Sequence, residues 1–227
     1  MILLSIGLVG SLIYLTTTRL DISYVIHQVN QFMSSPQHLD RAAIRRIIRY
    51  HRGSPTHELF FPTDSSLQLV AYSDADWSGC PDTRRSTTGW CMFLGDALIS
   101  WKCKKQDRVS KSSIEAKYRA MSTACSEIIW LRGLLEELGF SQTTSTPLYA
   151  DNTSAIQIGT NLVFHERTKH IEVFCHSILD TLESRVISLH HISSDLRVAD
   201  VFTKALTRQQ HQFLVGKLLL VDLPASI

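Results

Sequence analysis

The spacing of apolar positions changes along the chain and predicts where helices give way to strands. In residues 1–52, apolar side chains recur every three or four positions, which is typical of helices packed on one face. From residue 63 onward, short apolar runs alternate with amphipathic helical segments, of which the longest covers about 113–138. This order predicts an α/β domain that follows a small helical N-terminal appendage.

The expected elements of the α/β part begin with three strands. Two of them flank Gly95-Asp96, a pair that suits a tight hairpin turn. The expected ranges are strands at 67–74, 89–94 and 97–102, a helix at 113–138, a strand at 146–150, a short helix from 153, a helix at 170–183, a strand at 186–192 and a last helix at 196–206. The expected organisation is a helical region at 1–61, a core domain at 62–208 and a C-terminal tail at 209–227.

Composition excludes several classes of protein. The chain has 227 residues with 44% hydrophobic and 19% charged side chains, which fits a globular protein. The chain has five cysteines, which is an odd number, and no C-x-x-C motif. This pattern favours free thiols over disulfides or a zinc site, and it argues against secretion. The apolar start ends near Thr16, short of the roughly 20 residues that a membrane span needs, so we expect no membrane contact.

Four acidic residues stand where strands end or helices begin, and they are the candidate metal ligands. They are Asp74, Glu115, Asp151 and Asp200. Because strand ends and helix starts gather at one edge of an α/β sheet, these carboxylates can converge and bind Mg²⁺. Ordinary structural roles are the alternative: Ser112-x-x-Glu115 is a capping box, and either Asp151 or Asn152 can cap the next helix.

A local basic cluster is the candidate contact for nucleic acid, since the net charge of +2 says little by itself. Residues 101–111 contain five cations against one aspartate, and Arg84, Arg85 and the segment 165–170 add further positive charge. The five cations are Lys102, Lys104, Lys105, Arg108 and Lys111. Such a stretch predicts contact with phosphates, whereas the alternative is a solvated loop.

The order of several motifs resembles a known family. The motifs are Tyr-Ser-Asp-Ala-Asp-Trp (72–77), Arg-Arg-Ser-Thr-Thr-Gly (84–89), Ser-Lys-Ser-Ser-Ile-Glu-Ala-Lys-Tyr (110–118), Tyr-Ala-Asp-Asn-Thr-Ser-Ala-Ile (149–156), His-Glu-Arg-Thr-Lys-His-Ile (165–171) and Ala-Asp-Val-Phe-Thr-Lys-Ala-Leu (199–206). Together they resemble the ribonuclease H domain of copia-type LTR retrotransposon polyproteins. Residues 9–24 are similar to the stretch that follows the reverse transcriptase there, so the resemblance covers nearly the whole chain.

The resemblance implies a fold and an activity. The fold would be ribonuclease H-like, with a mixed five-stranded sheet flanked by helices, and residues 1–61 would be a thumb- or connection-like remnant. The activity would be endonucleolytic hydrolysis of the RNA strand of RNA–DNA hybrids during reverse transcription. Two Mg²⁺ ions, or Mn²⁺ in their place, would bind the four carboxylates, and His191, rather than His190, would assist. The implied partners are the hybrid and the reverse transcriptase domain, in a cytoplasmic virus-like particle or the nucleus.

The sequence also departs from the family pattern, and the departures support an alternative function. The family's Glu-Ala-Glu-Tyr reads Glu115-Ala116-Lys117-Tyr118, and Arg197 replaces a usual glutamine. Because Lys117 lies two positions after Glu115, we expect it to face away from the site with little effect. The alternative is an inert or nucleic-acid-binding relic of a larger polyprotein. A third possibility is a regulatory domain that docks on a polymerase through its apolar N-terminal helices.

Overall fold

The chain folds into two compact units. The computed structural model describes residues 2–33, 38–160, 172–193, 196–218 and 220–222. The first unit comprises Met1–Phe60 and Lys204–Ile227, and the second comprises Phe61–Thr203. Each unit has its own buried apolar cluster. The predicted division into a helical region at 1–61, a core domain at 62–208 and a tail at 209–227 stays a prediction.

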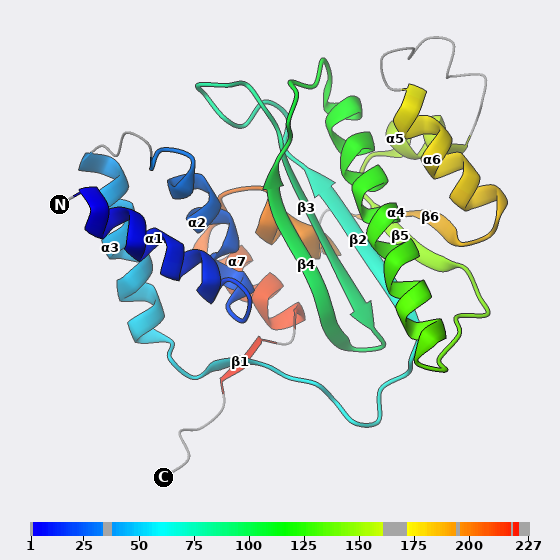
Figure 1. The fold of residues 1–227 in the computed structure, drawn as a ribbon, viewed down its shortest axis with the longest axis horizontal. Helices are drawn as coiled ribbons and strands as arrows, with labels where there is room; N and C mark the ends of the chain where they lie inside the picture. Colours follow the sequence, from blue (N-terminus) through cyan, green and yellow to red (C-terminus); the bar gives the residue numbers. More distant parts are fainter. Residues whose placement is uncertain (1, 34–37, 161–171, 194–195, 219, 223–227) are drawn as a thin grey trace. The chain divides into compact units, whose positions relative to one another are not determined.

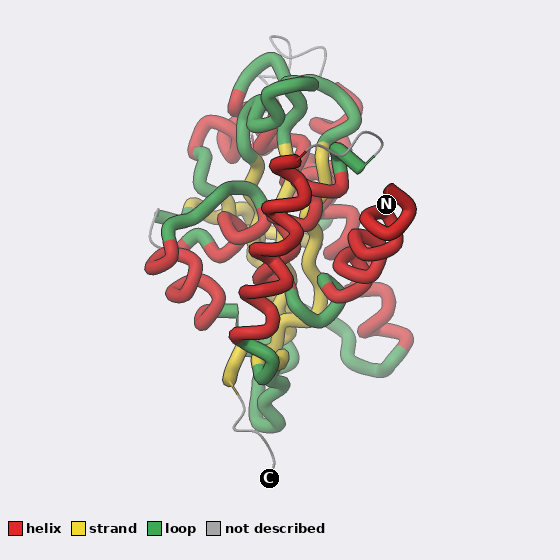
Figure 2. The backbone as a smooth tube through the Cα atoms, turned by 90° about the vertical axis from the view of Figure 1, so that its left-hand side faces the viewer, coloured by secondary structure: helices red, strands yellow, loops and turns green. Residues whose placement is uncertain are grey.

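The first unit is mainly helical. Its elements are α1 (Ile2–Leu15), the 3-10 helix η1 (Leu20–Ile22), α2 (Ser23–Asn30), α3 (His38–Gly53), β1 (His57–Leu59), α7 (Arg208–Lys217) and β7 (Leu220–Asp222). Helix α1 carries the N label in Figure 2. Strands β1 and β7 pair antiparallel. The predicted C-terminal tail therefore supplies a strand of this unit, and most of helix α7 lies in the same segment. Among the described residues, no helix is both long and apolar enough to cross a membrane.

A buried ion pair ties the helices of the first unit together. The Arg19 guanidinium donates to both carboxylate oxygens of Asp21, at 2.9 and 2.7 Å, and also to the carbonyl of Ser54 at 2.7 Å. The Tyr50 hydroxyl donates to Asp21 at 2.8 Å. Burial alone would raise the pKa of Asp21, but the hydrogen bonds and the charge of Arg19 hold that pKa below its ordinary 3.8. The pair therefore fixes the turn before α2 to the end of α3.

The second unit is built on a mixed five-stranded sheet. Its elements are β2 (Leu69–Ala75), β3 (Thr87–Leu94), β4 (Ala97–Lys105), α4 (Ser113–Glu137), β5 (Thr146–Ala150), α5 (Thr153–Thr160), α6 (Glu172–Glu183), β6 (Ile187–His191) and the 3-10 helix η5 (Val198–Phe202). The strand order is β4-β3-β2-β5-β6, with β3 antiparallel to both its neighbours and β2, β5 and β6 parallel. The predicted ribonuclease H-like architecture is therefore confirmed.

Helix α4 covers one face of this sheet, as Figure 1 shows. Its fully buried side chains pack with those of the central strands, including Ala71 and Leu148, because the helix presents an apolar stripe at a 3.6-residue period. The 3-10 helix η5 contacts β2 and β3. It approaches at Gly89, where an added Cβ would lie 2.6 Å from Thr203 Cγ2 and 2.7 Å from Phe202 Cβ. Glycine at this position therefore allows η5 to reach the ends of the strands.

Candidate active site

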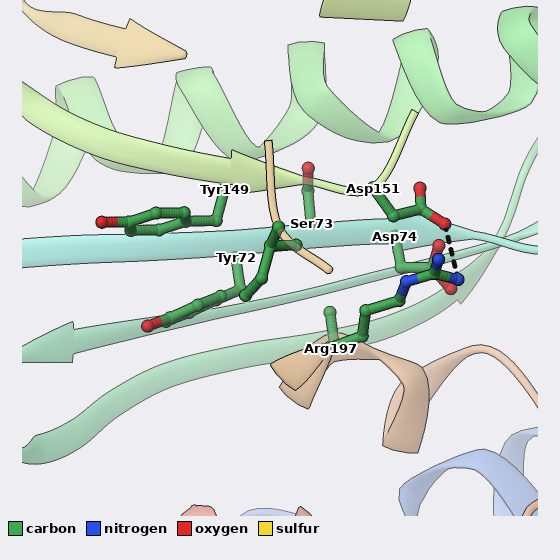
Figure 3. A pocket seen from close by; sticks show the side chains of 8 residues that line it. Tyr72, Ser73, Asp74, Tyr149, Asp151 and Arg197 are labelled. Atoms are coloured by element: carbon green, nitrogen blue, oxygen red, sulfur yellow. Dashed lines mark ion pairs between the residues drawn. The ribbon is translucent and has the colours of Figure 1, made fainter. Parts of the chain in front are cut away.

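Two of the four predicted acidic ligands lie side by side at the ends of parallel strands. Asp74 is near the end of β2, and Asp151 follows β5 directly. Tyr72 and Tyr149 are register partners, so alternation along each strand places Asp74 and Asp151 on their side of the sheet (Figure 3). The aspartate side chains are only 2% and 9% exposed. Two carboxylates this deeply buried require nearby positive charge.

Lys117 supplies much of that charge, which corrects the expectation that it faces away from the site. Its Nζ lies 2.8 Å from Asp74 Oδ1 and 2.5 Å from each carboxylate oxygen of Asp151. The Lys117 side chain is 15% exposed, so the ammonium group is largely removed from solvent. One cation therefore bridges both strand-end aspartates.

The phase of α4 explains why the lysine, rather than the glutamate, reaches the aspartates. Successive helical residues are separated by about 100°, so positions 115 and 117 point in nearly opposite directions. Lys117 precedes Met121 by four residues, Ala124 by seven and Ile128 by eleven, and all three are fully buried. Lys117 therefore continues the stripe that faces the sheet. This spacing is visible in the sequence and could have identified the residue.

Glu115 is instead engaged at the start of α4. Its Oε1 accepts hydrogen bonds from Arg119 at 2.7 and 3.1 Å, and its Oε2 accepts from the backbone N–H of Lys111 at 2.8 Å. Ser112 Oγ accepts from the Glu115 N–H at 3.1 Å, which is one half of the expected capping box. Both carboxylate oxygens of Glu115 thus have local partners, and its role as a metal ligand stays a prediction.

Arg197 adds a second cation to the pair of aspartates. Its Nη1 lies 3.0 Å from Asp151 Oδ2, the ion pair drawn as a dashed line in Figure 3. The Thr203 hydroxyl donates a short hydrogen bond to Asp74 Oδ2. The two carboxylates thus face two cations, and the formal charge of these four groups is zero. The sequence interpretation missed the contacts of Thr203 and of both cations.

Of the remaining predicted catalytic residues, Asp200 lies in a different element than expected, whereas His191 lies at the end of the predicted last strand. Asp200 lies within η5, which is a five-residue 3-10 helix and not the expected helix over 196–206. The 3-10 helix ends at Phe202, and a separate helix, α7, begins after its N-cap Thr207, with Gln210 completing the capping box. His191 ends β6 beside Ala150 and is exposed. Asn152, and not Asp151, caps α5, since its Oδ1 accepts from the Ala155 N–H at 2.8 Å.

The residues as they stand do not fit two divalent cations. A Mg²⁺ ion bound to Asp74 and Asp151 would lie about 2.0–2.1 Å from its ligand oxygens, in the space that the Lys117 ammonium takes. The charge that would attract it is already neutralised by Lys117 and Arg197. Within the described part of the chain, no group of three or more His, Cys, Asp or Glu side chains is arranged to bind a metal ion.

The predicted basic residues form an exposed set, with one exception. The exception is Lys105, which is only partly exposed and whose Nζ donates to Cys80 Sγ at 2.8 Å. Burial opposes ionisation of the Cys80 thiol, but this contact and nearby hydrogen bonds lower the pKa of Cys80 to about 7. The exposed cations are Arg84, Arg85, Lys102, Lys104, Arg108 and Lys111. The segment 165–170 lies outside the described residues.

Comparisons with known proteins place the sequence among retroelement polyproteins. No family model matches the chain. It is 41% identical over 220 residues to the Retrovirus-related Pol polyprotein from transposon RE1 of Arabidopsis thaliana, covering 97% of this chain and 15% of that protein. It is 36% identical over 205 residues to the corresponding polyprotein from transposon TNT 1-94 of Nicotiana tabacum, covering 90% and 15%. The chain thus spans about 15% of the length of these relatives.

Among solved structures, the chain is similar to LC11-RNase H1 isolated from compost. The TM-score is 0.44 and the sequence identity is 12%, over 60% of this chain and 93% of that one.

Proposed function

The chain is a segment of a copia-type retrotransposon Pol polyprotein with a ribonuclease H-like fold, and on this premise we propose that it binds RNA–DNA hybrids without cutting them. Function toward the hybrid can take two forms. The family resemblance implies metal-dependent hydrolysis of the RNA strand during reverse transcription, whereas the departures from the family pattern support binding without turnover. The setting would be a virus-like particle in the cytoplasm, or the nucleus, beside the reverse transcriptase.

A single observation favours binding without turnover: the Lys117 ammonium contacts both strand-end aspartates, at 2.5–2.8 Å. Hydrolysis in this family would use Mg²⁺ or Mn²⁺ to activate water and stabilise the leaving oxygen. A pocket that attracts such ions needs net negative charge and free carboxylate oxygens. Here the lysine provides the positive charge, and its Nζ donates to the oxygens that would bind the ions.

The second departure from the family pattern also favours binding without turnover. Arg197, at the position of a usual glutamine, pairs with Asp151 at 3.0 Å. Two cations from elements far apart in the sequence therefore converge on Asp151. Both changes reduce the negative charge of the same pocket, whereas the exposed cations that could contact phosphates stay available to a ligand.

The test is one preparation of the full chain assayed for both binding and cleavage. Binding of a fluorescein-labelled RNA–DNA hybrid is followed by anisotropy, and cleavage of the RNA strand is followed on denaturing gels with Mg²⁺ or Mn²⁺. We expect salt-dependent binding and intact RNA. Cleavage of the RNA strand by the unmodified chain in Mg²⁺, absent after chelation, would show that hydrolysis is the correct form. Absence of hybrid binding at low salt would reject both forms.

A further inference from the structure

Trp77, which follows the end of β2, is an exposed aromatic side chain in the loop that also carries Arg84 and Arg85. It is 56% exposed, whereas Trp90 in the sheet is 3% exposed. Its indole Nε1–H donates to the Ser110 carbonyl at 3.2 Å. This hydrogen bond joins the loop after β2 to the loop between β4 and α4. The ring is therefore held at one edge while much of its surface stays open to solvent.

Further hydrogen bonds hold both ends of this contact. On one side, Asp76 Oδ1 accepts from the backbone N–H groups of Thr87 at 2.8 Å and Gly79 at 3.4 Å, which shapes the turn around Trp77. Ser78, the next residue, has a positive φ of 54°, an uncommon conformation for a residue other than glycine. Such conformations persist where surrounding contacts enforce them, and they cluster at ligand-binding sites.

On the other side, Ser110 is anchored by a buried amide. Its hydroxyl donates to Gln106 Oε1 at 2.8 Å, and Gln106 Nε2 donates to Thr88 Oγ1 at 3.0 Å and to the Ala116 carbonyl at 2.9 Å. Gln106 thereby links its loop to β3 and to the first turn of α4. A side chain that is held before it meets a ligand loses little conformational freedom on binding.

The two joined loops also carry positive charge. Arg84 and Arg85 lie in the first loop, and Arg108 and Lys111 lie on either side of Ser110 in the second. All four are exposed. An open, anchored indole in loops that carry exposed cations matches the chemistry that binds single-stranded nucleic acid, where bases stack on aromatic rings and cations contact the phosphates.

We propose that Trp77 is a stacking site for an unpaired nucleobase next to the bound hybrid. A paired base inside a helix has both faces covered by its neighbours, so a fixed ring can stack only on an unpaired base or a strand end. The partner is therefore a single-stranded overhang that continues from the hybrid, held at its phosphates by the four cations. This proposal rests on the proposed function, because the hybrid is the ligand from which the overhang extends.

The test compares two ligands and three variants. The ligands are a blunt RNA–DNA hybrid and the same hybrid with a single-stranded overhang, and affinity is measured by anisotropy. The variants are Trp77→Ala, Trp77→Phe and Trp130→Ala. Trp130 is a matched control because it is 59% exposed and lies on α4, in the same unit. Circular dichroism and thermal unfolding check that each variant is folded.

The unmodified chain should bind the overhang hybrid more tightly than the blunt one. Trp77→Ala should weaken binding of the overhang ligand roughly 5- to 150-fold, the range that corresponds to one lost stacking contact. Binding of the blunt hybrid and the salt dependence should change little. Trp77→Phe retains a ring without the N–H anchor and should recover part of the lost affinity for the overhang ligand. Trp130→Ala should bind both ligands with the affinities of the unmodified chain.

Equal affinities of Trp77→Ala and the unmodified chain for the overhang ligand would overturn the stacking proposal while leaving hybrid binding intact. Failure of the unmodified chain to bind either ligand would instead reject the proposed function on which it rests. Tryptophan fluorescence gives a second readout that is independent of affinity. The overhang should quench the emission of the unmodified chain more than that of Trp77→Phe, and equal quenching would also overturn the assignment.

Discussion

Replacing Lys117 by glutamate tests whether its ammonium group stands in for a metal ion. In the unmodified chain, two aspartates face two cations, whereas in the variant three carboxylates would face only Arg197. The local formal charge of these side chains falls from zero to −2. The lysine is 15% exposed and its partners are 2% and 9% exposed, so solvent screens the change only in part.

The expected loss of stability follows from breaking a largely buried ion pair, which costs about 3–5 kcal/mol. For a protein of this size, that corresponds to a Tm lowered by roughly 6–20 °C in the absence of divalent cations. Mg²⁺ should then bind the folded variant. At about 100 times Kd it should restore about 2.7 kcal/mol, or roughly 5–11 °C.

The assay is thermal unfolding of the full chain with chelator and across a Mg²⁺ titration. Lys104→Glu is the matched control, because it makes the same change in net charge at an exposed position of β4. The unmodified chain and Lys104→Glu should show little dependence on Mg²⁺. The reasoning would be refuted if Mg²⁺ raised the Tm of Lys117→Glu no more than that of Lys104→Glu.

Three further expectations follow from other parts of the molecule. The folded-state pKa of Asp21 lies below 3.8, so the ionised carboxylate contributes its full stability above pH 3.8, and this contribution is lost as the pH falls through the folded-state pKa. Unfolding curves measured across this pH range should show the loss for the unmodified chain and not for Asp21→Asn. Gly89→Ala should destabilise the chain by about 1–3 kcal/mol, because η5 approaches closely there. Gly133→Ala should stabilise the chain by up to about 1 kcal/mol, because the space around an added Cβ on α4 is open. Equal shifts in the denaturant midpoint of the two variants would contradict both expectations. Changing Lys102 and Lys104 together to alanine should lower the log–log salt slope of hybrid binding by about 0.9 per lost phosphate contact, and an unchanged slope would mean that they are solvated side chains.

The fold could be predicted from the sequence because local signals and the global architecture agree. The hairpin around Gly95, which has a φ of +59°, the strand at 146–150 and the long helix over 113–137 lie where the periodicity places them. The last helix was predicted wrongly since apolar spacing alone does not reveal a break. The capping box at Thr207 and Gln210 was a readable signal for the separate helix α7, which lies in a segment predicted as a tail.

The candidate site could be predicted only in part. Asp74 and Asp151 converge as expected, because strand ends in a parallel pair meet at one edge. The partners of these carboxylates could not be read from position alone, since a lysine stem reaches several ångströms from its backbone. The apolar spacing of α4 indicates that Lys117, and not Glu115, faces the sheet, but spacing alone does not show which carboxylates the lysine contacts.

The cations in the pocket also change what a single carboxylate does for stability. In a cluster of carboxylates without counter-charge, neutralising one relieves repulsion and costs little. Here Asp74 accepts from both Lys117 and Thr203, so Asp74→Asn should destabilise the chain by about 3–5 kcal/mol. Lys117→Met alone should also destabilise it, because two buried carboxylates then lose their shared cation. The double variant should be more stable than the sum of the two losses predicts, by about 0.5–3 kcal/mol. The reason is that Asp74→Asn leaves the lysine charge that Lys117→Met removes, and Lys117→Met leaves the carboxylate charge that Asp74→Asn removes. Strictly additive losses in denaturant unfolding would mean that Lys117 and Asp74 do not stabilise each other in solution, and the basis for an inert pocket would be lost.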